Sequence, residues 1–381
     1  MIPYGRQDIR QEDIDRVVEV LRSDFLTQGA QVPVFEAAVA AATGAAHAVA
    51  VNSATSALHV ACLALGLGPG DILWTSPITF VASANVGRLC GAEVDFVDID
   101  PETFNMSPVA LEAKLERAAA AGRLPKVLMP VHMAGQSCDM EAIGALARRY
   151  GVRVIEDASH AIGGRLNGVP VGACADSDIA VFSFHPVKIV TTAEGGVATT
   201  NDADLAQKMQ LYRSHGVTRD PALMDRDSEG GWYYQQIALG LNYRMTELQA
   251  ALGVSQMTRL GEYVARRNQL ADRYDAALGN LPLKRPGRQP GACSAFHLYV
   301  VRVGDRQRAP VFARLRDADI GVNVHYIPVH LQPYWRDLGF RPGQFPQAEA
   351  YYRGAISIPL YPGLTAQDQD RVIATLADAL A

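Results

Sequence analysis

Short apolar segments alternate with longer amphipathic segments between residues 47 and 200 of the chain. Apolar runs such as Ala48–Val51 and Ile179–Phe184 have the length of buried strands. The segments between them, such as Met140–Tyr150, carry apolar residues at the spacing of one helix face. Strands that alternate with helices indicate an α/β layer architecture with a mostly parallel central sheet. Such sheets bind ligands at the carboxyl ends of their strands, so the residues that follow each strand are the candidates for chemistry.

The same two patterns, short apolar runs and apolar residues at helical spacing, predict the elements of the whole region. The predicted strands are Ala48–Val51, Asp71–Trp74, Glu93–Val97, Lys126–Val131, Val152–Ile155, Ile179–Phe184 and Gly196–Thr200. The predicted helices are Ile9–Leu21, Pro33–Ala42, Asn52–Leu65, Phe80–Cys90 and Met140–Tyr150. Because a polar turn separates each strand from the next helix, the strand ends carry most of the candidate side chains.

The pattern changes after Thr246, where the alternation gives way to a long amphipathic segment. Its spacing predicts a helix over Glu247–Leu278 with a bend near Gly261, followed by the Pro/Gly/Arg-rich connection Pro282–Pro290. Two strands, Ala295–Val303 and Val322–Tyr326, and a C-terminal helix come next. A chain of 381 residues exceeds the size of most single cores. We therefore predict a large domain over residues 1–250 and a smaller α+β domain over residues 251–381.

Composition and charge exclude several classes of protein. Hydrophobic residues make up 49% and charged residues 20%, which is typical of a globular chain. The net charge of −5 carries no basic excess, so a nucleic-acid partner is not expected. The cysteines are scattered without a C-x-x-C pair, which favours free thiols over a disulfide framework or a zinc site. The N-terminal residues lack the pattern of a signal peptide, and no apolar run reaches the ~20 residues that span a bilayer. We expect a cytoplasmic protein without a membrane partner or a metal.

Lysine is scarce in this chain, and Lys188 has unusual surroundings. It follows the strand Ile179–Phe184 and precedes a Thr/Gly-rich turn that leads into the next strand. Desolvation there would lower the pKa of the amine and favour its neutral form, which can form a covalent bond with a carbonyl cofactor. A structural lysine is the alternative interpretation.

Asp157 ends another apolar strand, where a carboxylate without a partner is costly. It caps the following turn in one interpretation, and in the other it pairs with the ring nitrogen of a pyridine cofactor and keeps that ring protonated. Asn52–Ser56, at a strand-to-helix junction, offers amides and hydroxyls suited to a phosphate, although a capping box has a similar sequence. Ser183 could add a hydroxyl to that phosphate, and Phe80 could stack on an aromatic ring or belong to the core. The histidines lack metal-ligand spacing.

Together these residues resemble the sugar aminotransferases of the DegT/DnrJ/EryC1/StrS family, a branch of the fold-type I enzymes that use pyridoxal 5′-phosphate (PLP). The resemblance covers nearly the whole chain. The segments that carry it are Leu26–Gly29, Asn52–Leu58, Pro77–Ala82, Glu156–Ala161, Phe182–Lys188, Thr192–Gly196 and Gly240–Met245. It implies an aspartate-aminotransferase-like fold, with a large PLP-binding domain and a smaller C-terminal domain.

The resemblance also implies roles for single residues. Lys188 matches the lysine that bonds to PLP and moves protons, and Asp157 matches the partner of the pyridine nitrogen. His160 matches a position, often Gln or His, beside the ring hydroxyl, and Phe80 matches the aromatic residue that covers the ring. The residues that match the phosphate site are Ala54, Thr55, Ser183 and Asn242. In this family the asparagine reaches the phosphate from the neighbouring subunit, which implies a homodimer with shared active sites.

Within the family, Phe182–Lys188 and the opening Ile2–Gly5 are most similar to the aminotransferases of pseudaminic acid biosynthesis. These enzymes take nitrogen from L-glutamate, pass it through pyridoxamine 5′-phosphate (PMP), and aminate C4 of UDP-2-acetamido-2,6-dideoxy-β-L-arabino-hexos-4-ulose. The residues that match their substrate-binding segments are Tyr4, Leu26, Thr27, Gln28, Gly29, His185, His325, Tyr326, Ile327 and Pro328. This sequence departs from the family pattern at Ala54 and Ala193, where glycine is common.

Other functions remain open from the sequence. The nearest alternative is a C4 or C3 aminotransferase that acts on another UDP- or dTDP-linked keto sugar. A non-catalytic nucleotide-sugar binder or regulator with a vestigial PLP site is an alternative of a different class. Related PLP dehydratases carry a histidine in place of the lysine, so Lys188 argues against that branch. No G-x-G-x-x-G follows the first strand, which argues against a nicotinamide-dependent enzyme.

Overall fold

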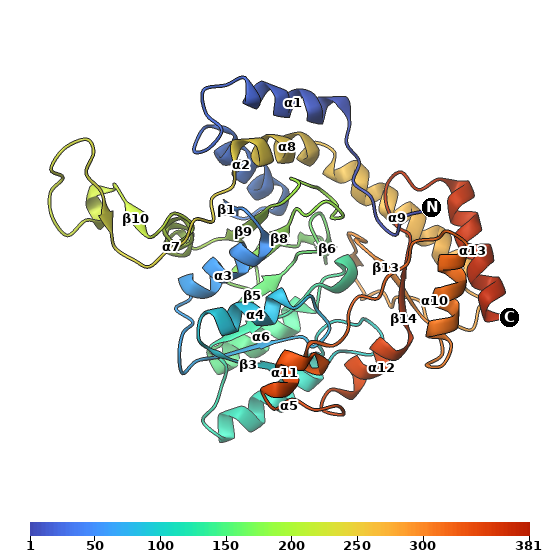
Figure 1. The fold of residues 1–381 in the computed structure, drawn as a ribbon. Coiled ribbons are helices and arrows are strands. Elements are labelled where there is room, and N and C mark those ends of the chain that lie inside the picture. The colour runs from blue at the N-terminus through green and yellow to red at the C-terminus, as the bar shows by residue number, and fades with distance from the viewer.

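The computed structural model describes residues 1–381, and its centre is a seven-stranded sheet with the strand order β1-β9-β8-β5-β4-β2-β3 (Figure 1). The strands are β1 (His47–Val51), β2 (Ile72–Thr75), β3 (Glu93–Phe96), β4 (Val127–Met129), β5 (Arg153–Asp157), β8 (Ile179–Ser183) and β9 (Gly196–Thr200). Only β9 runs antiparallel to its neighbours, and all other neighbouring pairs are parallel. The prediction of an α/β fold with a mostly parallel sheet is therefore confirmed.

Helices cover both faces of this sheet because successive side chains of each strand point to opposite sides. Val49 and Val51 of β1 belong to the core on one face, whereas Ala48 and Ala50 belong to the core on the other. The first core receives α3 (Ala54–Ala64), α4 (Ala82–Leu89) and α7 (Ala203–Arg213). The opposite face is covered by α2 (Gln31–Thr43) and α8 (Glu247–Met257), and further along by α5 (Pro108–Ala120) and α6 (Met140–Tyr150). Helix α1 (Gln11–Leu21) lies outermost, against α8 (Figure 1).

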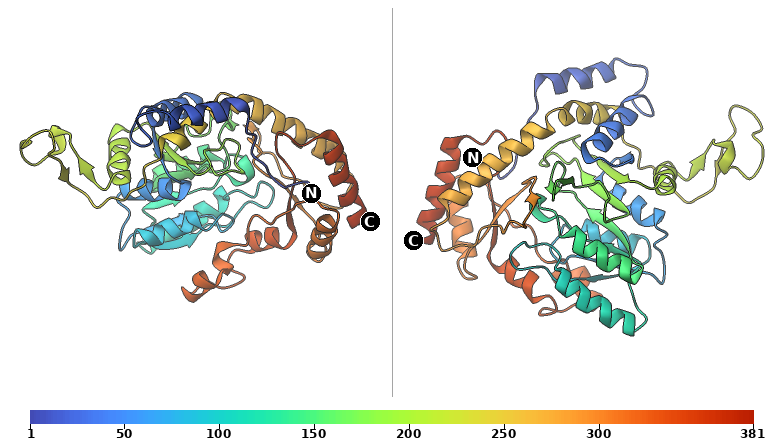
Figure 2. Two further views of the ribbon diagram at one scale, coloured as in Figure 1. Left: turned by 45° about the horizontal axis from the view of Figure 1, so that its top comes forward. Right: turned by 180° about the vertical axis from the view of Figure 1, so that it is seen from behind.

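The C-terminal part of the chain builds a second, smaller core beside the sheet. Its strands β13 (Tyr299–Arg302) and β14 (Ala355–Ile358) pair antiparallel and pack with α9 (Leu260–Ala277), α10 (Arg308–Asp317) and α13 (Ala366–Leu380). Figure 2 shows this part beside the sheet, joined to it by the long α9. The intervening α11 (Pro333–Asp337) and α12 (Pro346–Gly354) return to the large core, where Trp335 and Tyr351 are buried. The division predicted at residue 250 falls within α8 and stays a prediction.

Short elements complete the fold. A three-stranded sheet contains β6 (Arg165–Leu166), β7 (Val169–Pro170) and β12 (Ala292–Cys293). The strands β10 (Val217–Thr218) and β11 (Gln235–Gln236) form a hairpin that projects away from the body of the molecule (Figures 1 and 2). None of the helices combines the length and the apolar composition that a membrane span requires.

One sequence-based expectation for the C-terminal half is confirmed and one is wrong. The segment predicted as a helix over Glu247–Leu278 with a bend near Gly261 is divided into α8 and α9 at Thr258 and Arg259, two residues before Gly261. At this break the Arg259 guanidinium lies 2.7 Å from the buried carboxylate of Asp13. The strand predicted over Val322–Tyr326 is reduced to a single bridge between Asn323 and Ser357.

The loop between β8 and β9 contains Ala193 in the left-handed region, with φ of 64°. A Cβ in that region approaches the following carbonyl oxygen, which costs roughly 1–2 kcal/mol. Ala193→Gly is therefore expected to raise the free energy of unfolding by roughly 1 kcal/mol, after allowance for the greater freedom of glycine in the unfolded chain. Urea unfolding followed by circular dichroism measures this. Ala374→Gly, on the exposed face of α13, is the matched control and should destabilise by about 1 kcal/mol.

Candidate active site

A cavity of about 930 Å³ opens at the carboxyl ends of the central strands. Its walls include Asn52–Ser56 after β1, Asp157 at the end of β5 and Ser183 at the end of β8. The turn after β2 and the segment 323–326 close the remaining sides. The volume is in the range of small-molecule sites, and the position is the one that the topology of a parallel sheet predicts.

Most of the residues predicted from the sequence meet in this cavity. The predicted residues that line it are Tyr4, Ala54, Thr55, Phe80, Asp157, His160, Ser183, His185, Lys188, His325 and Tyr326. The predicted residues that do not line it are Leu26, Thr27, Gln28, Gly29, Asn242, Ile327 and Pro328. The Leu26–Gly29 segment pairs instead with the start of α8, where the Glu247 amide donates to the Leu26 carbonyl. Their roles stay predictions.

The Asp157 carboxylate is buried and held by two serine hydroxyls, one on each oxygen. Ser83 Oγ donates to Oδ2 at 2.6 Å, and Ser159 Oγ donates to Oδ1 at 2.5 Å. Thr79 Oγ1 lies 2.7 Å from Ser83 Oγ and extends the network. These donors satisfy a buried charge that would otherwise be costly, and they fix the direction in which the carboxylate faces. Sequence reasoning missed both serines, although Ser159 belongs to a motif that the resemblance used.

Lys188 lies in the turn after β8, and its side chain enters the same cavity. The turn is closed by backbone hydrogen bonds from Thr192 to Phe184 and from Lys188 to His185, both at 2.9 Å. Burial lowers the pKa of the Lys188 amine to about 8, against the opposing attraction of the Asp157 carboxylate. A lysine with this pKa is partly neutral near neutral pH, and the neutral amine is the nucleophilic form.

The start of α3 forms a second polar wall. Ser53 caps the helix by accepting a hydrogen bond from the Ser56 amide at 3.1 Å, and Ala54 and Thr55, at the same helix terminus, line the cavity. A helix N-terminus of this kind attracts anions. Gly196 of β9 permits the arrangement, because a Cβ there would lie 2.4 Å from the Ser53 carbonyl oxygen.

Three neutral histidines surround the lysine: His160, His297 and His325. Burial, together with the nearby Lys188 charge, lowers the pKa of each imidazole, to about 4 for His325 and well below the usual value for the other two. The rings of His160 and His297 lie 4.5 Å apart between centroids. Sequence reasoning missed His297, because nothing in its local sequence shows that it folds back onto the end of β5.

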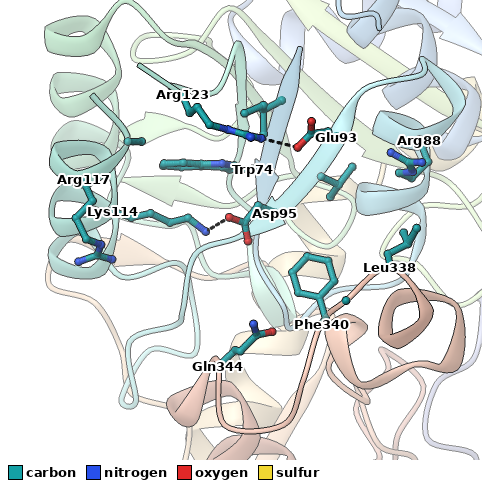
Figure 3. A pocket seen from close by; sticks show the side chains of 14 residues that line it. Trp74, Arg88, Glu93, Asp95, Lys114, Arg117, Arg123, Leu338, Phe340 and Gln344 are labelled. Carbon is teal, nitrogen blue, oxygen red and sulfur yellow. Dashed lines mark hydrogen bonds and ion pairs between the residues drawn. The ribbon is translucent and has the colours of Figure 1, made fainter. Parts of the chain in front are cut away.

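A second cavity, of about 740 Å³, lies at the free edge of β3 (Figure 3). Figure 3 shows that its two carboxylates are already engaged: Asp95 pairs with Lys114 and Glu93 with Arg123, each at 2.6 Å. No acid is left to meet a ligand cation, and the cavity does not adjoin the carboxyl ends of the strands. The buried lysine, the held carboxylate and the helix terminus described above line the larger cavity.

Known proteins resemble this chain over its whole length. The sequence model of the DegT/DnrJ/EryC1/StrS aminotransferase family matches residues 7–377. The spore coat polysaccharide biosynthesis protein SpsC of Bacillus subtilis (strain 168) is 41% identical over 385 residues, covering 99% of this chain and 96% of SpsC. PseC of Helicobacter pylori, an aminotransferase involved in the biosynthesis of pseudoaminic acid, has a TM-score of 0.90 at 29% identity, covering 100% of this chain and 99% of PseC. Spr1654 of Streptococcus pneumoniae, in its PMP form, has a TM-score of 0.91 at 30% identity, covering 100% of this chain and 99% of Spr1654.

The low pKa of Lys188 can be measured without any substrate. In the protein freed of cofactor, labelling of Lys188 by a small acylating reagent should rise with pH through a midpoint near 8, because only the neutral amine reacts. Peptide mass spectrometry reads the extent of labelling, and the exposed Lys208 in the same sample supplies the reference profile. A Lys188 profile that coincides with that of Lys208 would contradict the assignment.

Proposed function

This chain belongs to the DegT/DnrJ/EryC1/StrS aminotransferase family, and on that basis we propose that it aminates C4 of UDP-2-acetamido-2,6-dideoxy-β-L-arabino-hexos-4-ulose with nitrogen from L-glutamate, in pseudaminic acid biosynthesis. The family establishes a PLP-dependent sugar aminotransferase. The observation that carries the proposal is the convergence of Lys188, Asp157 and the start of α3 on one cavity. The specific sugar is supported by the likeness to PseC and by the similarity of Phe182–Lys188 to enzymes of that pathway.

The residues of the cavity fit PLP. The buried Asp157 carboxylate, held by Ser83 and Ser159, is suited to a protonated ring nitrogen, and the amides of Ala54 and Thr55 are suited to a phosphate. When bound, PLP supplies an electron sink for the carbon that loses its proton. Ser183 adds a hydroxyl on the phosphate side.

Lys188 would move the protons of the reaction. Its Nζ removes the proton from Cα of glutamate in the first half-reaction, and in the second it delivers a proton to C4 of the sugar. A pKa of about 8 suits both directions, because the amine can accept and release a proton close to neutral pH. Phe80, which is 60% exposed, lies at the open side of the cavity, where it would cover the ring face.

We further propose a homodimer whose active sites are shared. Lys188 is the only lysine or arginine among the residues that line the cavity, so a nucleotide diphosphate needs additional donors from elsewhere. The projecting hairpin and the segment after it carry apolar side chains that need a cover, with Trp232 73% and Leu239 83% exposed. Asn242, which follows them, is exposed and lies outside its own cavity, where it is free to serve the cavity of a second copy.

A second candidate keeps the reaction and changes the sugar. SpsC, a spore coat polysaccharide biosynthesis protein, is 41% identical to this chain, and this favours a C4 or C3 amination of another UDP- or dTDP-linked keto sugar. A panel of nucleotide keto sugars, with products read by mass spectrometry, separates the two. A non-catalytic binder with a vestigial PLP site is disfavoured by the intact set of Lys188, Asp157 and Thr55.

Lys188→Arg should abolish transamination while the fold is retained, because a guanidinium stays protonated and cannot bond to the cofactor aldehyde. The measurement is the visible absorption of protein loaded with PLP, before and after L-glutamate is added. The wild type should lose its long-wavelength band and release 2-oxoglutarate, whereas the variant should do neither. Near-normal turnover by the variant would remove Lys188 from its role, and a wild-type band that ignores glutamate would remove the proposed function.

Mixing two inactive variants tests the shared sites. When equal amounts of Lys188→Ala and Asn242→Ala chains are unfolded and refolded together, the mixture should regain about a quarter of the wild-type activity, because about half of the dimers are hybrids and one of the two sites in each hybrid keeps both residues. Each variant refolded alone is the control and should stay near its own low activity. If the mixture were no more active than its parents, Asn242 would act within its own chain or not at all.

A further inference from the structure

Two free cysteines lie in contact in the core that receives α3 and α4, outside the cavity of the candidate active site. Cys62 belongs to α3 and is fully buried, whereas Cys90 directly follows α4 and is 9% exposed. The two side chains form a hydrogen bond, in which the Cys62 thiol donates to the Cys90 sulfur. The loop after α3 lies at the same place, because a Cβ on Gly91 would approach Pro69 to 3.1 Å. The sulfur atoms are therefore neighbours, although they come from different elements.

A histidine contacts the more accessible of these two thiols. His59, one helical turn before Cys62 on α3, forms a hydrogen bond with the Cys90 side chain. Its Nδ1 lies 3.1 Å from the hydroxyl oxygen of Tyr243, so Nε2 is the nitrogen that remains for Cys90. The hydrogen bonds from Cys62 and His59 lower the pKa of the Cys90 thiol, whereas the contact with Cys90 and burial raise the pKa of Cys62. Cys90 is therefore the cysteine that ionises, and Cys62 stays protonated.

This arrangement has the parts of a thiol that reacts with an oxidant. The thiolate is the reactive form of cysteine, and a neighbouring base that is oriented by a third group generates it. Here His59 is the base, Tyr243 orients it, and the buried Cys62 lies where it can attack the oxidised sulfur. The proposed transamination uses none of these residues, because none of them lines the cavity.

We propose that Cys90 and Cys62 form a redox pair, in which hydrogen peroxide oxidises Cys90 and Cys62 then closes a reversible disulfide. In the first step the Cys90 thiolate attacks a peroxide oxygen, the S–O bond forms and the O–O bond breaks. The leaving oxygen takes the proton that His59 holds and becomes water. In the second step the Cys62 sulfur attacks the Cys90 sulfur, the S–S bond forms, and the S–O oxygen leaves as a second water with the Cys62 proton. The two sulfur atoms lose two electrons, and the peroxide gains them.

The disulfide would join the two helices that support the cofactor site. Helix α3 begins with Ala54 and Thr55, which line the cavity, and α4 carries Ser83, whose hydroxyl lies 2.6 Å from the Asp157 carboxylate. Both cysteines lie toward the opposite, C-terminal ends of these helices. The bond therefore fixes α3 relative to α4 without entering the cavity.

Hydrogen peroxide added to the purified protein loaded with PLP tests the proposal, and digestion by trypsin followed by mass spectrometry reads the result. Trypsin cleaves after Arg88, which places Cys62 and Cys90 in separate peptides, 23–88 and 89–114. We expect these peptides to become joined with the loss of the two thiol hydrogens, and to separate again after dithiothreitol. The chain should remain a monomer on a non-reducing denaturing gel, because the bond lies within one chain.

Three variants distinguish a redox pair from thiols that only fill the core. Cys62→Ser should let Cys90 proceed to the sulfinic acid without a link, because the second thiol is gone. His59→Gln should slow formation of the link about tenfold or more, because an ordinary thiol is only a few per cent thiolate at neutral pH. Cys293→Ser, at an exposed cysteine, is the matched control and should leave the rate unchanged.

Two results would overturn the proposal. If peroxide oxidised the exposed Cys293 while peptides 23–88 and 89–114 stayed unlinked, Cys62 and Cys90 would be an inert part of the core. If the link formed equally fast in His59→Gln, the pair would lack the activating base on which the proposal depends. Neither measurement requires transamination, so both are independent of the proposed function.

Discussion

The site depends on a buried carboxylate whose charge is satisfied before any ligand arrives. Asp157 ends β5 in the centre of the sheet, and the hydroxyls of Ser83 and Ser159 hold one oxygen each. Burial of an ion without such donors would be prohibitive, and the group would protonate instead. Because two hydroxyls hold it in one orientation, the carboxylate can set the position of a cationic ring. It also opposes the effect that burial has on the pKa of Lys188. The Asp157 carboxylate thus influences both the position of a bound cofactor ring and the pKa of the Lys188 amine.

The other groups reach this carboxylate because parallel strands end at a common edge. The start of α3, the turn that carries Lys188 and the serine at the end of β8 all follow strands that are close neighbours in the sheet. Gly196 lets β9 approach the Ser53 carbonyl, so the helix terminus sits beside the turn of Lys188. The small C-terminal part supplies the opposite wall with His297, His325 and Tyr326. The strand topology brings these groups to one place, and the identities of the side chains then determine what the cavity can bind.

The sequence predicted the parts of this arrangement that are local. Apolar runs located the strands, and polar residues at their ends included Asp157 and Lys188 because a parallel sheet exposes those ends. Contacts between distant segments had no local signal. His297 is more than a hundred residues from β5, and Arg259, at the break between α8 and α9, pairs with Asp13 near the N-terminus. The projecting hairpin was missed because its strands are only two residues long.

The return of α11 and α12 to the large core has a consequence for motion. The small part is bound to the large part through α9 and again through Trp335 and Tyr351, which are buried in the large core. Two anchorages on either side of the small sheet leave no single hinge about which it could swing as a rigid body. Access to the cavity would therefore be through its open side, where Phe80 lies, rather than by domain closure.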